Sequence, residues 1–279
     1  MSPAARGPGP AAGDRGVLCI VLHAHMPYVE GFGTWPFGEE WLWEAVATSY
    51  LPLLELLPGR PVTVGLTPVL CDQLELLVGE TADRLRTFPR EVGVEAHEED
   101  ARGLERSGQG PAAAELRRAA GDYTAADQAL EALGGDLVGA FGRLASDGPA
   151  ELWAGPATHP VLPLLATDAG RRLQLASGVG GHERRFGGFE GGVWLPECAF
   201  EPGLEGELSD FGIRAFCVDQ TDALGLGSLE NLEPVATAGG PVAVPVDWLT
   251  VARVWDRERG YPAADAYRDT HRRTTHDRM

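Results

Sequence analysis

The sequence contains no lysine, and all 23 of its basic residues are arginine. Arginine remains protonated in proteins and supplies no neutral amine. The absence of lysine therefore excludes Schiff-base catalysis through a lysine, a phosphate-binding P-loop with its lysine, and a Ser–Lys catalytic pair.

Cysteine is scarce, with four residues and no pair at CxxC spacing. Each cysteine lies in or beside an apolar segment, as in 17-VLCIVL-22 and 213-IRAFCVD-219. We therefore expect reduced, buried cysteines rather than disulfides or metal ligands. The four residues are Cys19, Cys71, Cys198 and Cys217.

Long hydrophobic runs are also missing, since none approaches the ~18 residues of a membrane-spanning helix. Residues 1–16 are rich in proline, glycine and alanine and lack the apolar core of a signal peptide, which predicts a disordered tail.

Acidic residues outnumber basic ones by 41 to 23, for a net charge of −18. This charge disfavours nucleic acid and anionic membranes as partners. It suits a cytoplasmic protein, or one with a neutral substrate.

What the sequence does contain is a series of short apolar runs, each ending in a polar or proline-containing tip. Continuous apolar runs of this kind fit strands that are buried on both faces, as in a parallel sheet. The runs are 17-VLCIVL-22, 61-PVTVGL-66, 151-ELWAGP-156, 192-GVWLP-196, 212-GIRAFCV-218 and 241-PVAVPV-246.

Helical patterns separate several of these runs. Residues 39–57 have apolar side chains at helical spacing, and residues 204–212 form a short amphipathic stretch that ends in glycine. Strand, polar tip and helix in alternation favour an α/β fold of the (β/α)-barrel type over an open sheet. Residues 80–145 are rich in Ala, Glu and Arg and predict a helical insertion. Residues 224–240 predict a loop, with a short hairpin as an option.

The polar tips hold the residues that are best suited to catalysis or ligand binding. In a barrel the carboxyl ends of the strands form one rim, so side chains from different tips can converge. These tip residues are His23, His25, His159, Glu197, Asp219, Asp247 and Trp248.

Each of these residues also has a purely structural interpretation. A single histidine can be a hydrogen-bonded core residue, and His159 can cap the following helix. His23 and His25 are at i and i+2, so on an extended segment they face the same way and could instead bind a metal. Asp219 and Asp247 can be helix N-caps. Trp194 and Trp248 can be core residues or flat surfaces on which sugar rings stack.

Taken together, the tip residues are more informative than any one of them. Carboxylates, histidines and tryptophans at one rim, without lysine or a phosphate-binding glycine loop, suit carbohydrate chemistry. In that chemistry two carboxylates act across a glycosidic bond, one as nucleophile and one as general acid/base.

Five segments together resemble the signature regions of glycoside hydrolase family 57, and within it the α-1,4-glucan branching enzymes. They are 22-LHAHMPYV-29, 38-GEEWLWEA-45, 65-GLTPVL-70, 151-ELWAGPATHPVLPLL-165 and 192-GVWLPECAF-200. The resemblance implies an incomplete seven-stranded (β/α) barrel, a retaining mechanism without metal or organic cofactor, and an α-1,4-glucan as the partner. It further implies α-1,6 branch formation in glycogen synthesis.

The resemblance also implies roles for individual residues. Glu197 corresponds to the nucleophile. His23, His25 and His159 correspond to histidines of the donor-sugar subsite, with Trp194 packed beside them. Tyr261 corresponds to a tyrosine on a loop that favours transfer over hydrolysis. We assign Asp219 and Trp248 to the same substrate-binding rim.

One part of the family pattern has no match. The acid/base aspartate of the family follows the seventh strand, and neither Asp219, Asp247, Asp269 nor Asp277 corresponds to it. We therefore expect residues 17–279 to be a catalytic barrel domain that is shortened before its last strand and the helical C-terminal region. We expect impaired turnover and an open sheet edge as consequences.

Three other functions stay open at this point. One is an α-amylase or 4-α-glucanotransferase of the same family. Another is a metal-dependent, deacetylase-like barrel that uses His23, His25 and His159. The last is a glucan-binding protein without catalysis.

Overall fold

The computed structural model describes residues 17–33, 38–77, 80–219 and 232–264. The predicted tail at 1–16, part of the loop predicted at 224–240, and Asp269 and Asp277 lie outside these ranges.

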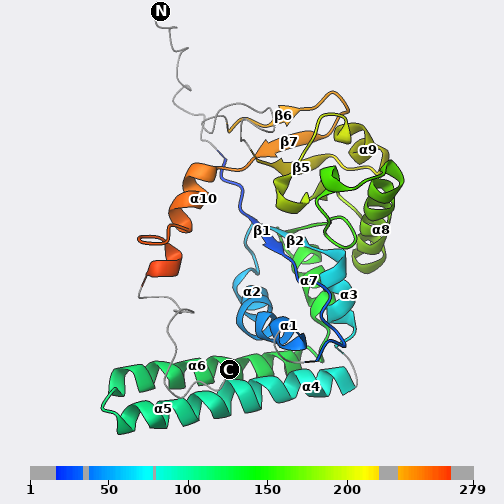
Figure 1. The fold of residues 1–279 in the computed structure, drawn as a ribbon. Helices are drawn as coiled ribbons and strands as arrows, with labels where there is room; N and C mark the ends of the chain where they lie inside the picture. Colours follow the sequence, from blue (N-terminus) through cyan, green and yellow to red (C-terminus); the bar gives the residue numbers. More distant parts are fainter. Residues whose placement is uncertain (1–16, 34–37, 78–79, 220–231, 265–279) are drawn as a thin grey trace, which may run out of the picture.

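Six parallel strands follow one another in chain order, three in one sheet and three in a second sheet (Figure 1). A parallel bridge between Ala154 and Val193 joins the first three strands to the rest. The six strands confirm the six predicted runs. They are β1 (Val21–Ala24), β2 (Thr63–Leu66), β3 (Glu151–Trp153), β4 (Gly192–Val193), β5 (Ala215–Val218) and β7 (Val242–Pro245).

Helices connect these strands, so the fold is an α/β barrel of the (β/α) type. Within the described ranges no pairing joins β1 to β7, and the barrel is incomplete. The short strand β6 (Val235–Ala236) pairs antiparallel with β7 and forms a hairpin. The connecting helices are α1 (Glu39–Ala45), α2 (Leu51–Leu56), α3 (Pro68–Glu75), α8 (Asp168–Phe186), α9 (Leu204–Asp210) and α10 (Trp248–Val254), with a π-helical segment, Val46–Tyr50, making α1 and α2 continuous.

The first strand begins later than the apolar run 17–22 predicts. Val17 and Leu18 are 88% and 84% exposed, and the strand starts at Val21. The reason lies just before β2, where Pro61 has no N–H to donate and the Val62 N–H donates to the Arg60 carbonyl. Without pairing partners, residues 17–19 cannot join the sheet. His23 is therefore inside β1 rather than after it.

The same shift corrects the expectation that all four cysteines are buried. Cys71, Cys198 and Cys217 are buried, whereas Cys19 is exposed because it precedes the strand. All four are free thiols.

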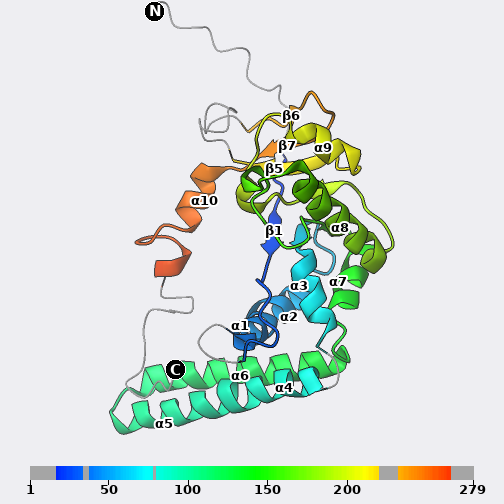
Figure 2. The same cartoon turned by 45° about the vertical axis from the view of Figure 1, so that its right-hand side comes forward.

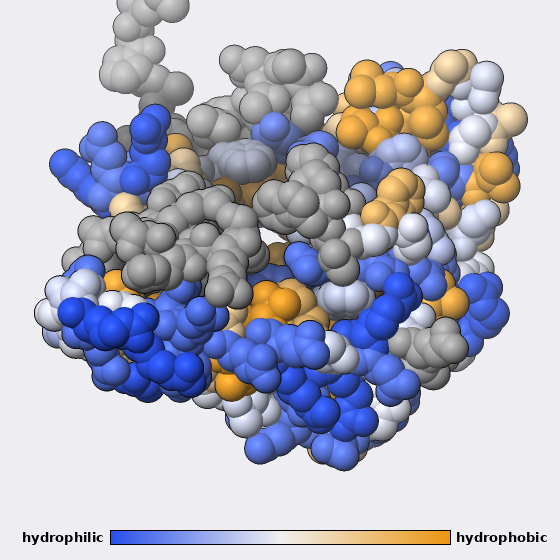
Figure 3. All heavy atoms as spheres, turned by 60° about the horizontal axis from the view of Figure 1, so that its bottom comes forward, coloured by the Kyte–Doolittle hydropathy of each residue, from blue (hydrophilic) through white to orange (hydrophobic). Residues whose placement is uncertain are grey.

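The helical insertion predicted at 80–145 is confirmed. Helices α4 (Glu80–Phe88), α5 (His97–Arg106) and α6 (Gly110–Ala132) lie beyond α1 and α2, away from the sheet (Figures 1 and 2). Much of the face seen from that side is hydrophilic (Figure 3). The last helix, α7 (Leu137–Ser146), instead packs against β3, α3 and α8.

Two apolar clusters stabilise the sheet. The first lies between β1, β2 and helices α1–α3 and α7, with Leu70 and Phe141 fully buried. The second lies around β4, β5, α8 and α9, with Leu208 and Phe216 fully buried. Because helices pack on the sheet from outside, the carboxyl ends of the strands remain available for a site.

Candidate active site

Glu197 lies directly after β4 in a 3-10 turn, Pro196–Cys198, and its side chain is exposed. The turn is closed by hydrogen bonds from the Cys198 N–H to the Leu195 carbonyl (2.9 Å) and from the Ala199 N–H to the Pro196 carbonyl (3.1 Å). The carboxylate is thus presented at the carboxyl end of the sheet.

This turn has an unusual backbone. Glu197 and Cys198 have φ of 57° and 52°, and His159 has φ of 59°. Among the residues that the structure describes, these are the only non-glycine residues with positive φ. Such conformations cost on the order of 1–3 kcal/mol each and concentrate at functional sites. The strain therefore marks the tips of β3 and β4.

Three histidines meet at the same rim. His23 and His159 are joined through their Nε2 atoms at 3.3 Å. The rings of His25 and His159 are stacked, with centroids 4.1 Å apart. His23 and His25 are stacked at 6.3 Å, as expected for i and i+2 residues at the end of a strand.

Trp194, directly after β4, completes this cluster. Its ring is stacked on His23 with centroids 4.7 Å apart and an angle of 13° between the planes. Its backbone N–H donates to the Ala154 carbonyl at 3.0 Å, which ties it to the end of β3. The predicted convergence of residues from three strand tips is therefore present.

Burial controls the charge of the histidine cluster. The pKa of His23 is lowered to about 4 and that of His159 to about 3, in both cases mainly by burial and to a smaller extent by neighbouring histidines. Burial also lowers the pKa of His25, while the negative charge of Glu197 opposes that shift. At neutral pH His23 and His159 are uncharged, so each ring can donate one hydrogen bond and accept another. The effect on His25 places Glu197 within electrostatic reach of the cluster.

Asp219 lies beside the turn of Glu197. Its backbone N–H donates to the Cys198 carbonyl at 3.3 Å. The pKa of the Cys198 thiol is raised to about 12, mainly by burial and to a smaller extent by Cys217, Asp219 and Glu197. Asp219 and Glu197 are therefore both within electrostatic reach of the buried Cys198 thiol.

Thr67 belongs to this site although its residue type did not draw attention in the sequence. It is 1% exposed, and its Oγ1 lies 3.3 Å from His25 Nδ1. The sequence could have identified Thr67, because it precedes Pro68 at the start of a helix and follows a buried strand.

The residues predicted after the last strand, and Tyr261 beyond them, make contacts within their own part of the chain. Asp247 is the N-cap of α10, accepting from the Thr250 N–H at 3.0 Å, so its structural interpretation holds. Trp248 begins α10 and is partly buried. Tyr261 is 45% exposed and lies edge-on to Trp255, with ring centroids 5.5 Å apart.

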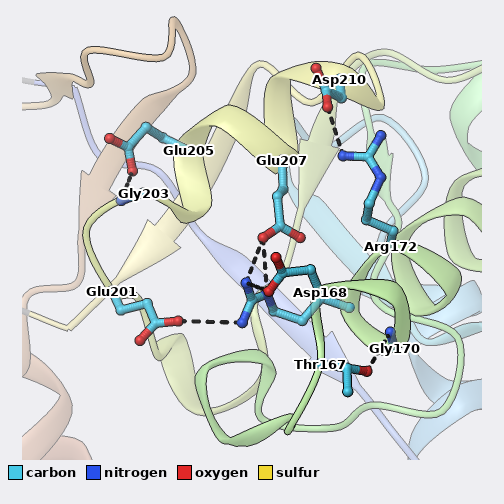
Figure 4. Close-up of polar contacts among 10 residues, drawn as sticks. Thr167, Asp168, Gly170, Arg172, Glu201, Gly203, Glu205, Glu207 and Asp210 are labelled. Carbon is cyan, nitrogen blue, oxygen red and sulfur yellow. Dashed lines mark hydrogen bonds and ion pairs between the residues drawn. The ribbon is translucent and has the colours of Figure 1, made fainter.

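An ion-pair network supports the segment after Glu197. Arg171, at the start of α8, binds Glu207 of α9 and Asp168 at 2.7 Å each, and approaches Glu201 at 3.7 Å. Figure 4 shows the three carboxylates converging from separate elements. This arrangement joins α8 and α9 to the chain four residues beyond Glu197.

A cavity of about 250 Å³ is lined by His23 and His25 together with Ala45, Ser49, Tyr50 and Leu53. A larger one of about 430 Å³, between α3 and α8, touches none of the predicted site residues. In the described part of the chain, no group of three His, Cys, Asp or Glu residues is arranged to hold a metal ion. No helix there is long and apolar enough to cross a membrane.

Comparison with known proteins identifies relatives of this chain. The model of glycosyl hydrolase family 57 matches residues 19–244. A 1,4-alpha-glucan branching enzyme of Thermococcus kodakarensis is 34% identical over 93% of this chain and 42% of its own length. A probable 1,4-alpha-glucan branching enzyme of Mycobacterium tuberculosis is 33% identical over 92% of this chain and 51% of its own.

Solved structures agree with the sequence relatives. A GH57-type branching enzyme from Pyrococcus horikoshii superposes with a TM-score of 0.82 and 32% identity, over 92% of this chain and 51% of that chain. The alpha-amylase AmyC from Thermotoga maritima has the same fold, with a TM-score of 0.77 and 24% identity, over 93% of this chain and 51% of that chain. The chain spans about half the length of these relatives.

Proposed function

Because this chain belongs to glycosyl hydrolase family 57, we propose that it acts on α-1,4-glucan as a retaining transglycosylase of the branching type. The relatives named as branching enzymes support this choice within the family. The proposed setting is the cytoplasm, where the enzyme would add α-1,6 branches to glycogen.

The observation that carries the proposal is the placing of one exposed carboxylate beside a stacked cluster of neutral histidines and a tryptophan. Glu197 is accessible and lies within electrostatic reach of His25. A carboxylate in this position can attack the anomeric carbon of a sugar that is bound against the cluster.

We assign the roles as follows. Glu197 is the nucleophile and forms the covalent glycosyl-enzyme. His23, His25 and His159 exchange hydrogen bonds with sugar hydroxyls, which neutral imidazoles can do as donors and acceptors. Trp194 offers an aromatic surface beside them. Asp219, next to the Glu197 turn, binds the same sugar or its neighbour.

Transfer to a glucan acceptor, rather than to water, needs a site that excludes water while the acceptor hydroxyl attacks. We assign Tyr261 and Trp248 to this part of the reaction. No residue of the chain is assigned as the acid/base, so protonation of the leaving group sets the expected limit on turnover of native glucan.

A substrate with a good leaving group tests the nucleophile without the acid/base. In 5-fluoro-α-glucosyl fluoride the C1–F bond breaks without protonation, fluoride leaves, and an ester bond forms between C1 and a Glu197 oxygen. We expect the mass of the chain to rise by one glycosyl group, on the peptide that contains Glu197. The variant Glu197→Gln should gain nothing, whereas Glu183→Gln, an exposed glutamate of α8, should label like the wild type. A label on another residue, or none on the folded chain, would overturn the assignment.

Linkage analysis of amylose after incubation tests the branching specificity. We expect new α-1,6 linkages and a fall in iodine absorbance, both lost in Glu197→Gln. Shortened chains without α-1,6 linkages would favour the α-amylase alternative, and redistributed α-1,4 chain lengths would favour the 4-α-glucanotransferase alternative.

A further inference from the structure

Gln73 is a buried polar residue of α3, only 1% exposed, and its side chain faces the backbone that follows β1. Its Oε1 accepts a hydrogen bond from the Val29 N–H at 2.7 Å. Its Nε2 donates toward the carbonyls of Met26 (3.3 Å), Pro27 (3.1 Å) and Val69 (3.1 Å). Gln73 therefore fixes the path of the chain directly after His25.

Gln174, on α8, makes the equivalent contacts with the loop after β3. Its Oε1 accepts from the Thr158 N–H at 2.8 Å, and its Nε2 donates to Thr158 Oγ1 at 2.9 Å. Its backbone carbonyl accepts from the Ala157 N–H at 3.0 Å. Thr158 immediately precedes His159, whose φ is 59°. A non-glycine residue keeps that conformation only where its surroundings hold it.

The start of α3 connects the two loops. Thr67 Oγ1 reaches His25 Nδ1 at 3.3 Å, and the Val69 N–H donates to the Ala157 carbonyl at 3.0 Å. The rings of His25 and His159 are stacked at 4.1 Å, and hydrogen bonds from the start of α3 and from α8 hold the loops that carry them.

From these contacts we infer that Gln73 and Gln174 are positioning residues, each holding the loop that presents one of the two stacked histidines to the sugar. Each glutamine bonds to the loop and acts on the histidine through it. Each acts through hydrogen bonds in both directions, so an apolar residue of similar size cannot replace it. The inference deepens the proposed function, and only its glucan-binding readout depends on that function.

The test compares Gln73→Leu and Gln174→Leu with a matched control, Gln128→Leu, on the exposed face of α6. Histidine ring signals are recorded by NMR at neutral pH and assigned with His25→Asn and His159→Asn. We expect the His25 signal to move in Gln73→Leu and the His159 signal to move in Gln174→Leu. The dissociation constant for maltotetraose should rise about tenfold in both and stay within about twofold in the control. Thermal unfolding checks that each variant is folded.

Conservative variants separate positioning from general loss of packing. In Gln174→Glu the carboxylate still accepts from the Thr158 N–H and can accept from its hydroxyl, so histidine signals and affinity should return close to wild type. In Gln73→Glu the carboxylate would face the carbonyls of Met26 and Pro27 without a donor. The histidine signals and the affinity of this variant should therefore not return to wild type. If Gln73→Leu does not fold, the variants Gln174→Leu and Gln174→Glu still test the inference. Gln174 is only partly buried, so its substitution should disturb folding less.

Unchanged histidine signals in folded leucine variants would overturn the inference, as would a Gln174→Glu variant no better than Gln174→Leu. A wild-type chain that binds no maltotetraose would instead count against the proposed function. The histidine signals would still decide whether the glutamines position the loops.

Discussion

His23 and His159 are 136 residues apart in the chain, yet their Nε2 atoms lie 3.3 Å apart. A hydrogen bond between two Nε2 atoms requires one ring to donate and the other to accept, so at least the accepting ring is neutral in this contact. The pairing thus links the tips of β1 and β3 and restricts the charge of the cluster.

The first prediction concerns stability against pH. The pKa of His23 falls to about 4, that of His159 to about 3 and that of the buried His182 to about 4, in each case mainly through burial. Between these values and the unfolded pKa of about 6.5 the unfolded chain binds more protons than the folded one. The stability is therefore full above pH 6.5 and decreases as the pH falls through this window. Each histidine contributes a slope of up to about 1.4 kcal/mol per pH unit.

Urea unfolding at several pH values measures this slope. In His159→Asn the slope of the free energy of unfolding against pH should correspond to about one proton fewer than in the wild type. Asparagine is chosen because it tolerates the positive φ at this position. A variant with the wild-type slope would show that His159 does not titrate as expected.

The second prediction concerns Trp194, stacked on His23 with centroids 4.7 Å apart. Trp194→Ala should weaken maltotetraose binding about tenfold, because an aromatic surface contributes on the order of 1 kcal/mol in such stacks. Calorimetry measures the affinity. Trp41→Ala, on the partly exposed Trp41 of α1, is the control and should bind as the wild type does. Equal losses in both variants would point to a general effect on folding.

The third prediction compares two adjacent arginines of α8. The Arg171 side chain is 16% exposed and contacts three carboxylates, whereas Arg172 is 46% exposed and pairs with Asp210 alone at 2.7 Å. Arg171→Ala should reduce the free energy of unfolding by about 1–2 kcal/mol, and Arg172→Ala by less than about 1 kcal/mol. Chemical denaturation measures both. Similar losses would mean that the network around Arg171 adds nothing beyond an exposed pair.

The fourth prediction concerns the thiols. Cys19 is exposed, while burial raises the pKa of Cys71, Cys198 and Cys217 to about 12 each. A thiol reagent should therefore modify one cysteine quickly in the folded chain and all four after unfolding. Cys19→Ser should remove the fast reaction. A fast reaction that persists in Cys19→Ser would place the exposed thiol elsewhere.

Much of the architecture follows from local sequence patterns. Six apolar runs became six parallel strands, and the helical spacing at 39–57 became one continuous helical stretch. These patterns are readable because a buried strand and an amphipathic helix each leave their own hydrophobic period in the sequence. The predicted beginning of the first strand was wrong, because apolar character alone does not reveal whether a neighbouring strand offers hydrogen-bonding partners.

For the site, the sequence by itself determined the inventory: a chain without lysine, with histidines and carboxylates at strand tips and a motif around Glu197 typical of its family. Only the tertiary structure decided which of them meet. Parallel pairing brings His23, His25, His159 and Trp194 together, and burial makes His23 and His159 neutral. The positive φ of Glu197 and the support from Gln73 and Gln174 likewise depend on contacts between distant segments. Residue types specify the chemistry that is possible, whereas long-range packing sets distance, orientation and charge.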